Sequence, residues 1–529
     1  MKVLWVVGLL LVSIQSGLAA ADPIQIGTQQ GTLLGEKTAE VAVFKGIPFA
    51  TPPVGVRRWR APEPAASWQG VRMATQFGPQ CIQEAYPEGS MFTRPSEPAS
   101  EDCLYLNVWS SNVGGKQPQA VMVWIHGGGL TRGSGASSIY DGTALAQKGV
   151  VVVTVNYRLG PFGYMAHPAL SAEAEAMGAA RSSGNYGTLD QVAALKWVQD
   201  NIAAFGGDNS RVTIFGESAG SWSVNHMTAT PLAAGLFHRA IGQSGAKFDP
   251  MPELARDYPD QPSAESRGVK FAAHLGQTSL PQLRALTAAE VLAGLQSFQV
   301  QGFAQPNVDG YVYPDHIANL FAAGTFNKVD LIVGSNADEG TNLMPPPKDA
   351  ESVAAVLDQS YGGFAGPLKA TYDYDDDYAS AYYGIFRDMI FTWNMREWAR
   401  HASQHKDNNT YLYYFTYVPP APMDGKLGAY HAAEIRYVFD NADITFDANP
   451  ATEEERRLGE VLSDYWVSFA KTGVPTSAQG DKWPQYDADR ERYMEFNTEA
   501  KARAGGVLTN KVDLIGRYMQ ASWDRREAE

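Results

Sequence analysis

The sequence has little cysteine, no long run of basic residues and, beyond its first segment, no long apolar run. Two cysteines in 529 residues are too few for a scaffold built on disulfides. The 42 Lys and Arg residues against 57 Asp and Glu residues give a formal net charge of −15. A chain this acidic, without a basic cluster, is not expected to bind duplex nucleic acid or an anionic membrane surface. After residue 21 no stretch has about 18 apolar residues without a charge, so we expect no membrane span in the mature chain.

The overall composition is that of a folded protein. Hydrophobic residues make up 44% of the chain and charged residues 19%, which excludes wholesale disorder, a coiled coil and a collagen-like fibre. The length alone would suggest about three or four domains. However, no linker rich in Pro, Gly or Ser divides the chain, and no period of about 20 to 50 residues repeats. We therefore expect a single domain over residues 22–529.

The first 21 residues have the pattern of a secretory signal peptide. Met1-Lys2 is a short positive segment, Val3 to Ile14 is largely apolar, and Ala19-Ala20-Ala21 offers a cleavage site with small residues. The alternative is an uncleaved N-terminal anchor. We expect a mature chain that starts near Asp22 and is exported, either to the periplasm or into the medium.

Export bears on the two cysteines, Cys81 and Cys103. In an oxidising compartment, one disulfide is the expected use of such a pair. The alternative is two free, buried thiols.

Short apolar runs alternate with helical patterns along the chain. The helical pattern from Thr188 to Phe205 stops before Gly206-Gly207. The runs typical of buried strands are Ala120 to Ile125, Val150 to Val155, Val212 to Phe215, Val329 to Val333 and the strand-like Tyr411 to Val418. Such alternation predicts an α/β fold with a mostly parallel sheet covered by helices on both faces. The weaker periodicity from about Pro252 to Phe391 predicts helical insertions above the sheet that wall a substrate pocket.

The strongest local signal is Gly216-Glu217-Ser218-Ala219-Gly220, a G-x-S-x-G motif between a predicted strand and a predicted helix. In this context the motif forms a strained turn that exposes the serine hydroxyl, and the glycines avoid clashes. The turn also places the Ala219 N–H beside the serine, near the positive end of a helix. Ser218 is therefore the candidate nucleophile.

A second signal, His126-Gly127-Gly128-Gly129, ends the predicted strand upstream. A glycine turn at this place lets backbone N–H groups approach a developing oxyanion. The alternative is a tight turn without a catalytic function.

A serine nucleophile needs a base and an orienting carboxylate, which follow such an elbow in the order serine, acid, histidine. Of the histidines, only His401, His405 and His431 lie beyond a credible acid. His401 and His405 fall four residues apart on a helical stretch without the glutamate of a zinc-protease motif, so we interpret them as a solvated helix face. His431, in a loop after a strand-like run, is the candidate base.

The acid is expected in the loop after the strand-like run Val329 to Val333. This loop contains two neighbouring carboxylates, Asp338 and Glu339. Spacing alone does not separate them.

Together these segments resemble the type-B carboxylesterases, the family that includes cholinesterases and bacterial esterases. The matching stretches are Glu101 to Trp109, Gly216 to Ser221, Asp338-Glu339-Gly340 and His431 to Ile435, with Gly184 to Gly187 and Phe205 to Asp208 between them. The resemblance covers nearly the whole mature chain. It implies an α/β-hydrolase fold and hydrolysis of small carboxylic esters, with no cofactor and no metal.

The resemblance also implies functions for individual residues. By it, Ser218 is the nucleophile, Glu339 the acid and His431 the base. Gly128, Gly129 and Ala219 would supply the oxyanion-hole N–H groups, and Cys81–Cys103 would be the family's first disulfide. An adhesion module on the same fold is the rival interpretation, but such relatives have typically lost one of these three side chains. An acyltransferase or a lactonase would use the same residues, and product analysis separates these activities.

Three residues near the elbow bear on the pocket. Members of this family usually carry an aromatic residue after the three glycines, whereas this chain has Leu130, which predicts a less aromatic pocket wall. Trp222 is either a second wall residue or a core tryptophan. Glu217 either biases the pocket toward positive groups or is a structural carboxylate.

The acidic run Tyr372 to Tyr378 lacks the Gly and the terminal Glu of a calcium loop. We expect it to be a solvated surface.

Overall fold

The computed structural model describes residues 22–527 except for 39, 87–89, 93–97, 260, 299–302, 304, 406, 422 and 445–449. The predicted signal peptide, residues 1–21, lies outside this part of the chain. Among the described residues, no helix has the length and apolar character needed to cross a membrane.

A 13-stranded sheet forms the centre of the described structure. Along the sheet the order is β1-β2-β3-β7-β9-β8-β10-β11-β12-β13-β14-β15, with β4 paired to β2, while β5 and β6 form a separate pair. The strands are β1 Asp22–Gly27, β2 Thr32–Thr38, β3 Val41–Pro48, β4 Val71–Met73, β5 Gln80–Cys81, β6 Ala99–Ser100, β7 Tyr105–Ser110, β8 Gln119–Ile125, β9 Val151–Val155, β10 Gly207–Glu217, β11 Arg239–Gln243, β12 Asp330–Asn336, β13 Thr410–Phe415, β14 Tyr493–Phe496 and β15 Ala500–Arg503.

The strands from β8 to β14 pair in parallel, and antiparallel strands flank them at both ends. Because β8 lies between β9 and β10, the direction of strand addition reverses at β8. In such sheets the ligand site lies at the carboxyl ends of the strands beside the reversal. The sheet is mostly parallel, as the sequence predicts.

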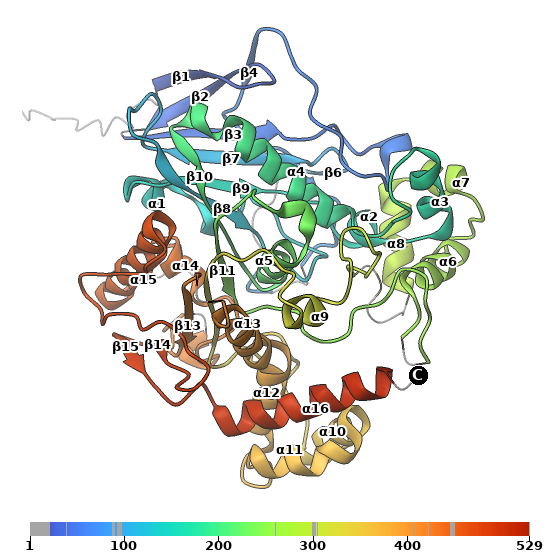
Figure 1. The fold of residues 1–529 in the computed structure, drawn as a ribbon, viewed down its shortest axis with the longest axis vertical. Coiled ribbons are helices and arrows are strands. Elements are labelled where there is room, and N and C mark those ends of the chain that lie inside the picture. The colour runs from blue at the N-terminus through green and yellow to red at the C-terminus, as the bar shows by residue number, and fades with distance from the viewer. Residues whose placement is uncertain are drawn as a thin grey trace, which may run out of the picture.

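Helices cover both faces of the sheet, and Figure 1 shows α4 and α5 on the side opposite α1 and α15. The helices are α1 Thr143–Gln147, α2 Gly160–Tyr164, α3 Pro168–Ala176, α4 Tyr186–Asn201, α5 Ala219–Ala229, α6 Ala264–His274, α7 Leu280–Ala285, α8 Ala288–Ser297, α9 Ile317–Ala322, α10 Ala350–Tyr361, α11 Ala365–Thr371, α12 Tyr378–Arg387, α13 Trp393–Ser403, α14 Ile435–Val438, α15 Glu453–Thr472 and α16 Thr509–Glu527. A π-helical turn, Asp388–Thr392, joins α12 to α13.

The central strands are buried on both faces, which explains why they read as continuous apolar runs. On β8, Val121 and Val123 belong to the core shared with α4 and α5. The alternating Met122 and Trp124 belong to the second core, which contains α15. All four side chains are at most 1% exposed.

Each strand predicted from an apolar run is present within a few residues of its expected bounds. The predicted helix is α4, which ends at Asn201 and continues as a 3₁₀ turn to Phe205. The N-terminal antiparallel strands and β11 were not predicted, because they are short or carry polar residues such as those of Thr32–Thr38.

Candidate active site

Ser218 lies at a sharp turn between β10 and α5. Its backbone angles are φ 58° and ψ −125°, a conformation that L-residues rarely adopt and that costs about 1–3 kcal/mol. The Ser218 N–H donates to the Gln243 carbonyl of β11 at 2.9 Å. A Cβ at Gly220 would lie 2.0 Å from the Ile125 carbonyl oxygen, and one at Gly216 would lie 2.7 Å from it. The absence of side chains at Gly216 and Gly220 thus allows the turn to pack in close contact with the end of β8.

The glycine turn after β8 lies directly against this elbow. A Cβ at Gly127 would lie 2.8 Å from the Glu217 carbonyl oxygen and 3.1 Å from the Ser218 Cβ. Gly128 and Gly129 have φ values of 107° and 66°, which favour glycine. Helix α5 begins at Ala219, so that first amide has no acceptor within the helix.

His431 and Glu339 are in direct contact. The His431 Nδ1 lies 2.5 Å from the Glu339 Oε2, and the other carboxyl oxygen accepts the Asn336 N–H at 2.7 Å. The neighbouring Asp338 points elsewhere and accepts the Ala429 N–H at 2.8 Å. Of the two carboxylates that spacing left equal, Glu339 is therefore the one at the imidazole.

Glu217 lies on the other side of the His431 ring. Its Oε1 is 3.1 Å from the His431 Nε2, and both side chains are 4% exposed. Burial raises the pKa of the Glu217 carboxyl well above its usual range. Burial lowers the pKa of His431, but the carboxylates of Glu217 and Glu339 outweigh this effect and raise it to about 9. Negative charge on Glu217 thus favours the imidazolium.

Glu434 is a third buried glutamate near the ring, and the sequence assigned it no function. Its carboxylate accepts the Gln243 Nε2–H at 3.0 Å and the Asn336 Nδ2–H at 2.6 Å. Burial raises the pKa of Glu434. Gln243 is the last residue of β11 and Asn336 is the last residue of β12. A polar residue at the carboxyl end of a parallel strand is the sequence signal by which these two partners of Glu434 could have been found.

A cavity of about 630 Å³ brings the predicted residues to one surface. Ser218, His431 and Glu217 line it, together with the glycine turn. From the insertion at residues 252–391, the lining residues are Leu343, Phe386, Ile390 and Phe391. Helices α6–α8 pack instead in a separate cluster around Phe271, so the wall expected from this region comes from its later part. Gln80, residues 83–86 and Phe92 also line the cavity.

Two of the expected wall residues differ in their placement. Trp222 lines the cavity and is partly buried. Leu130 does not line it, although Gly129 and Thr131 do. Its positive φ of 61° turns the chain, and its side chain lies in the main core with 3% exposure. Leu130 is therefore a core residue rather than a wall residue in this structure.

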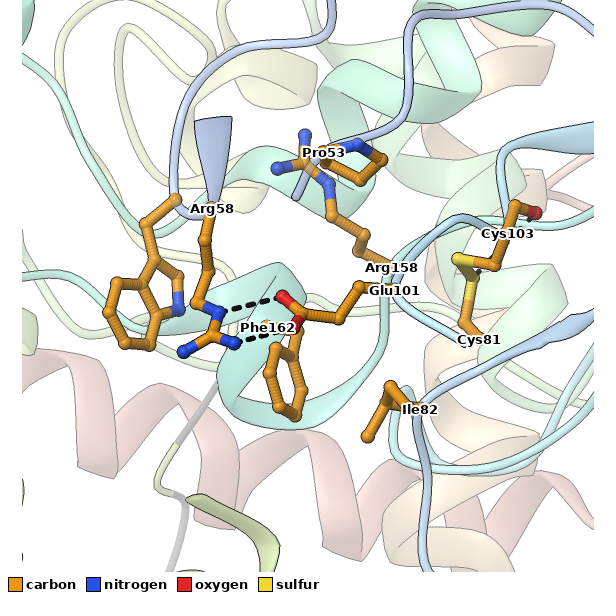
Figure 2. A pocket seen from close by; sticks show the side chains of 9 residues that line it. Pro53, Arg58, Cys81, Ile82, Glu101, Cys103, Arg158 and Phe162 are labelled. Atoms are coloured by element: carbon orange, nitrogen blue, oxygen red, sulfur yellow. Dashed lines mark hydrogen bonds and ion pairs between the residues drawn. A yellow bond between two sulfur atoms is a disulfide. The ribbon is translucent and has the colours of Figure 1, made fainter. Parts of the chain in front are cut away.

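The expected disulfide between Cys81 and Cys103 is present. Figure 2 shows it beside a partly buried ion pair in which the Arg58 Nε donates to the Glu101 Oε2 at 2.6 Å. The bridge closes the segment that supplies the cavity wall at residues 83–86 and 92.

The two histidines interpreted as a solvated helix face, His401 on α13 and His405 two residues beyond its end, are each partly buried against an aromatic ring. The His401 ring stacks on Phe248 with a centroid distance of 5.6 Å, and the His405 ring packs on the edge of Phe326. Burial lowers the pKa of both. Their spacing therefore reflects aromatic packing.

The acidic run is largely exposed, as expected. Its four aspartates, Asp373 and Asp375 to Asp377, are exposed, and Asp377 caps α12 through the Ser380 N–H at 3.0 Å. Within the described ranges, no group of three or more His, Cys, Asp or Glu side chains could hold a metal ion.

A family model described as "Carboxylesterase family" matches residues 22–515. This chain belongs to the carboxylesterase family. Fumonisin B1 esterase of Sphingopyxis macrogoltabida is 39% identical over 504 residues, which cover 92% of this chain and 88% of that protein. Para-nitrobenzyl esterase of Bacillus subtilis is 36% identical over 492 residues, covering 90% of this chain and 95% of the relative. A solved PNB esterase structure matches with a TM-score of 0.80 and 33% identity over 93% of this chain and 99% of that one.

As a member of this family, the carboxylesterase has the α/β-hydrolase fold and is a carboxylic ester hydrolase. The relatives named above are esterases, which favours the enzyme over the rival interpretation as an adhesion module.

Proposed function

We propose that this carboxylesterase cleaves small carboxylic esters through an acyl-enzyme on Ser218, with His431 as the base and Glu339 as the orienting acid. The observation that carries the proposal is the strained Ser218 on the same cavity as His431, whose Nδ1 contacts Glu339. A carboxylate at Nδ1 holds the imidazole so that Nε2, on the side where Glu217 also lies, is the atom that accepts a proton, and it stabilises the imidazolium that forms.

The proposed reaction has two halves. The Ser218 oxygen attacks the ester carbonyl carbon while the His431 Nε2 takes its proton. The N–H groups of Gly128, Gly129 and Ala219 hold the oxyanion. The imidazolium then gives its proton to the leaving alkoxide, and the alcohol departs. Water attacks the acyl-enzyme with His431 again as base, which releases the carboxylic acid and restores Ser218.

The cavity supports an ester with an apolar group. Trp222, Leu343, Phe386, Ile390 and Phe391 line it, and apolar surface of this kind is buried favourably. A graded series of p-nitrophenyl esters, with aryl and polycarboxylic esters added, tests the preference. The names of two relatives add para-nitrobenzyl esters and fumonisin B1 as substrates.

The first test concerns the nucleophile and the base. Ser218→Ala should lower kcat by about three orders of magnitude or more, and adding His431→Ala should cost little further, because such residues act as a unit. A fluorophosphonate should label Ser218 in the unmodified enzyme. Turnover by Ser218→Ala at the unmodified rate would contradict the proposal.

The acid is tested by a matched pair of neighbours. Glu339→Gln should reduce kcat by about 10³- to 10⁴-fold, because the amide cannot stabilise the imidazolium. Asp338→Asn should change kcat much less, since Asp338 binds the Ala429 amide instead. The reverse order of effects would assign the acid to Asp338.

We also propose that the chain is exported after cleavage near Ala21. The disulfide between Cys81 and Cys103 supports export, because such bonds form and persist in oxidising compartments. N-terminal sequencing of protein from the periplasm or the medium should begin near Asp22. Recovery of membrane-bound protein with an intact Met1 would contradict it.

A further inference from the structure

The segment after Cys81 is hydrogen-bonded to Arg132 and Gly133, which follow the glycine turn in the chain. We infer that Gln83 is a positioning residue for this turn, which carries the amides proposed for the oxyanion hole. The inference rests on the proposed function, because it concerns the same reaction. Figure 2 shows Cys81 and Ile82, where the segment begins.

The Gln83 side chain binds both backbone groups of Gly133, four residues after Gly129, the last glycine of the turn. Its Nε2 donates to the Gly133 carbonyl at 2.8 Å, and its Oε1 accepts the Gly133 N–H at 2.8 Å. Two bonds to the same residue fix its position and its orientation, as a strand partner would. The Gln83 Nε2 also donates to the Cys81 carbonyl at 3.1 Å, which holds the amide next to the disulfide.

The neighbouring residues continue the same attachment. The Arg132 Nη2 donates to the Glu84 Oε2 at 2.8 Å, and its Nε donates to the Ala85 carbonyl at 3.3 Å. Gln83 thus binds Gly133, and the next two residues bind Arg132, so the two segments run in opposite directions. The disulfide between Cys81 and Cys103 anchors the start of this segment.

Gly133 in turn lies tightly against the start of the glycine turn. A Cβ there would lie 2.3 Å from the His126 Nδ1 and 2.5 Å from the Gly127 carbonyl oxygen. The Arg132 N–H also donates to the Gly128 carbonyl at 2.9 Å. A displacement of Gly133 therefore moves the peptides that precede and carry the proposed N–H donors.

Oxyanion stabilisation depends on donors that are held in place before the reaction. A shift of about 1 Å in a positioned group can cost about 10²-fold in rate. Such a loss affects the transition state more than the bound ester, so it reduces kcat and leaves KM nearly unchanged.

The experiment compares Gln83→Ala with the unmodified enzyme on one p-nitrophenyl ester. The readouts are kcat per fluorophosphonate-titrated site, KM, and the affinity of an alkyl boronic acid that forms a tetrahedral adduct. We expect kcat and boronate affinity to fall together by about 10- to 100-fold, with KM changed by less than about threefold. Counting titrated sites removes any contribution from misfolded protein.

Gln199→Ala is the matched control. The Gln199 Nε2 donates to the carbonyls of Asn209 and Leu236 at 2.9 Å, so this variant loses two bonds to backbone where Gln83→Ala loses three. Gln199 is not among the residues that line the cavity. Gln199→Ala should leave kcat and boronate affinity unchanged.

Three results would overturn the inference: unchanged kcat and boronate affinity in Gln83→Ala, a loss equal to that of the control, or a rise in KM alone. The last result would mean that Gln83 contacts the substrate. Failure of the unmodified enzyme to be labelled at Ser218 would contradict the proposed function instead.

Discussion

Three buried glutamates lie near the His431 imidazole, and each has different partners. Glu339 contacts the ring and a backbone amide, and Glu434 accepts from two side-chain amides. The Glu217 Oε1 lies 3.1 Å from the ring but forms no hydrogen bond among the described residues. Glu217 is therefore the one of the three whose oxygen nearest the ring forms no hydrogen bond within the described structure.

Replacing Glu217 should shift the pH dependence of hydrolysis. The base must be neutral to accept a proton, so kcat/KM rises as pH passes above the pKa of His431. A carboxylate at Glu217 raises that pKa. Glu217→Gln should therefore move the acid limb of the kcat/KM profile to lower pH.

The profile of Asp338→Asn serves as the comparison and should stay in place, because Asp338 binds backbone away from the ring. An acid limb that stays fixed in Glu217→Gln would mean that Glu217 carries no charge beside the free enzyme's imidazole.

At the scale of elements, the site depends on how closely β10 and α5 approach β8. The elbow has no room for a side chain at Gly216 or Gly220, because the Ile125 carbonyl lies against both. The same close approach places the turn at Gly127 against Ser218. The packing of β10 and α5 against β8 thus also determines the position of Ser218 relative to the glycine turn.

Gly220→Ala tests this dependence. Its Cβ would lie 2.0 Å from a carbonyl oxygen, so backbone must move, and we expect a loss of about 2 kcal/mol or more in the free energy of unfolding. Activity should fall as well. Urea unfolding and ester hydrolysis measure the two effects.

Gly366→Ala on α11 is the control, since nothing lies within 4 Å of a Cβ there. Alanine in a helix is favoured over glycine by up to about 1 kcal/mol, so this variant should be at least as stable as the unmodified enzyme. Equal stability of the two variants would show that the elbow accommodates a methyl group.

At the scale of the whole molecule, ion pairs join peripheral segments that are distant in sequence. Glu173 on α3 accepts from Arg60 at 3.0 Å and from Arg284 on α7 at 2.7 Å. Hydrogen bonds from Arg284 and Arg60 lower the pKa of Glu173 to about 2, although partial burial opposes this. Its side chain is 24% exposed, so solvent screens part of the interaction.

Glu173→Gln should lower the free energy of unfolding at pH 7 by about 1–2 kcal/mol. Because the pKa in the folded state is lower than in the unfolded state, this stabilisation is complete above about pH 4.5 and disappears as pH falls toward 2. The difference between the two proteins in urea unfolding should therefore shrink over that range.

Glu175→Gln provides the comparison on the same helix. The Glu175 carboxylate is 62% exposed and lies 3.8 Å from Arg181, so the change should be within about 0.5 kcal/mol. A Glu173→Gln difference that is constant from pH 7 to pH 3 would contradict the ionic explanation.

Several features follow from the sequence because they depend on local spacing. Continuous apolar runs predict β8, β9, β10 and β12, since a strand buried on both faces needs apolar residues at every position. The elbow at Ser218 follows from glycines on both sides of a serine between a strand and a helix. The choice of His431 follows from chain order, which leaves few histidines to consider.

Other features depend on the tertiary structure because they require contacts between distant segments. Asp338 and Glu339 are adjacent, and only the position of residues 429–431 separates them. The placement of Leu130 depends on one positive φ. The attachment of Gln83 to Gly133 joins residues 50 positions apart, and no local pattern encodes such a pairing. Spacing along the chain thus determines which chemical groups are present, and packing between segments determines which of them meet.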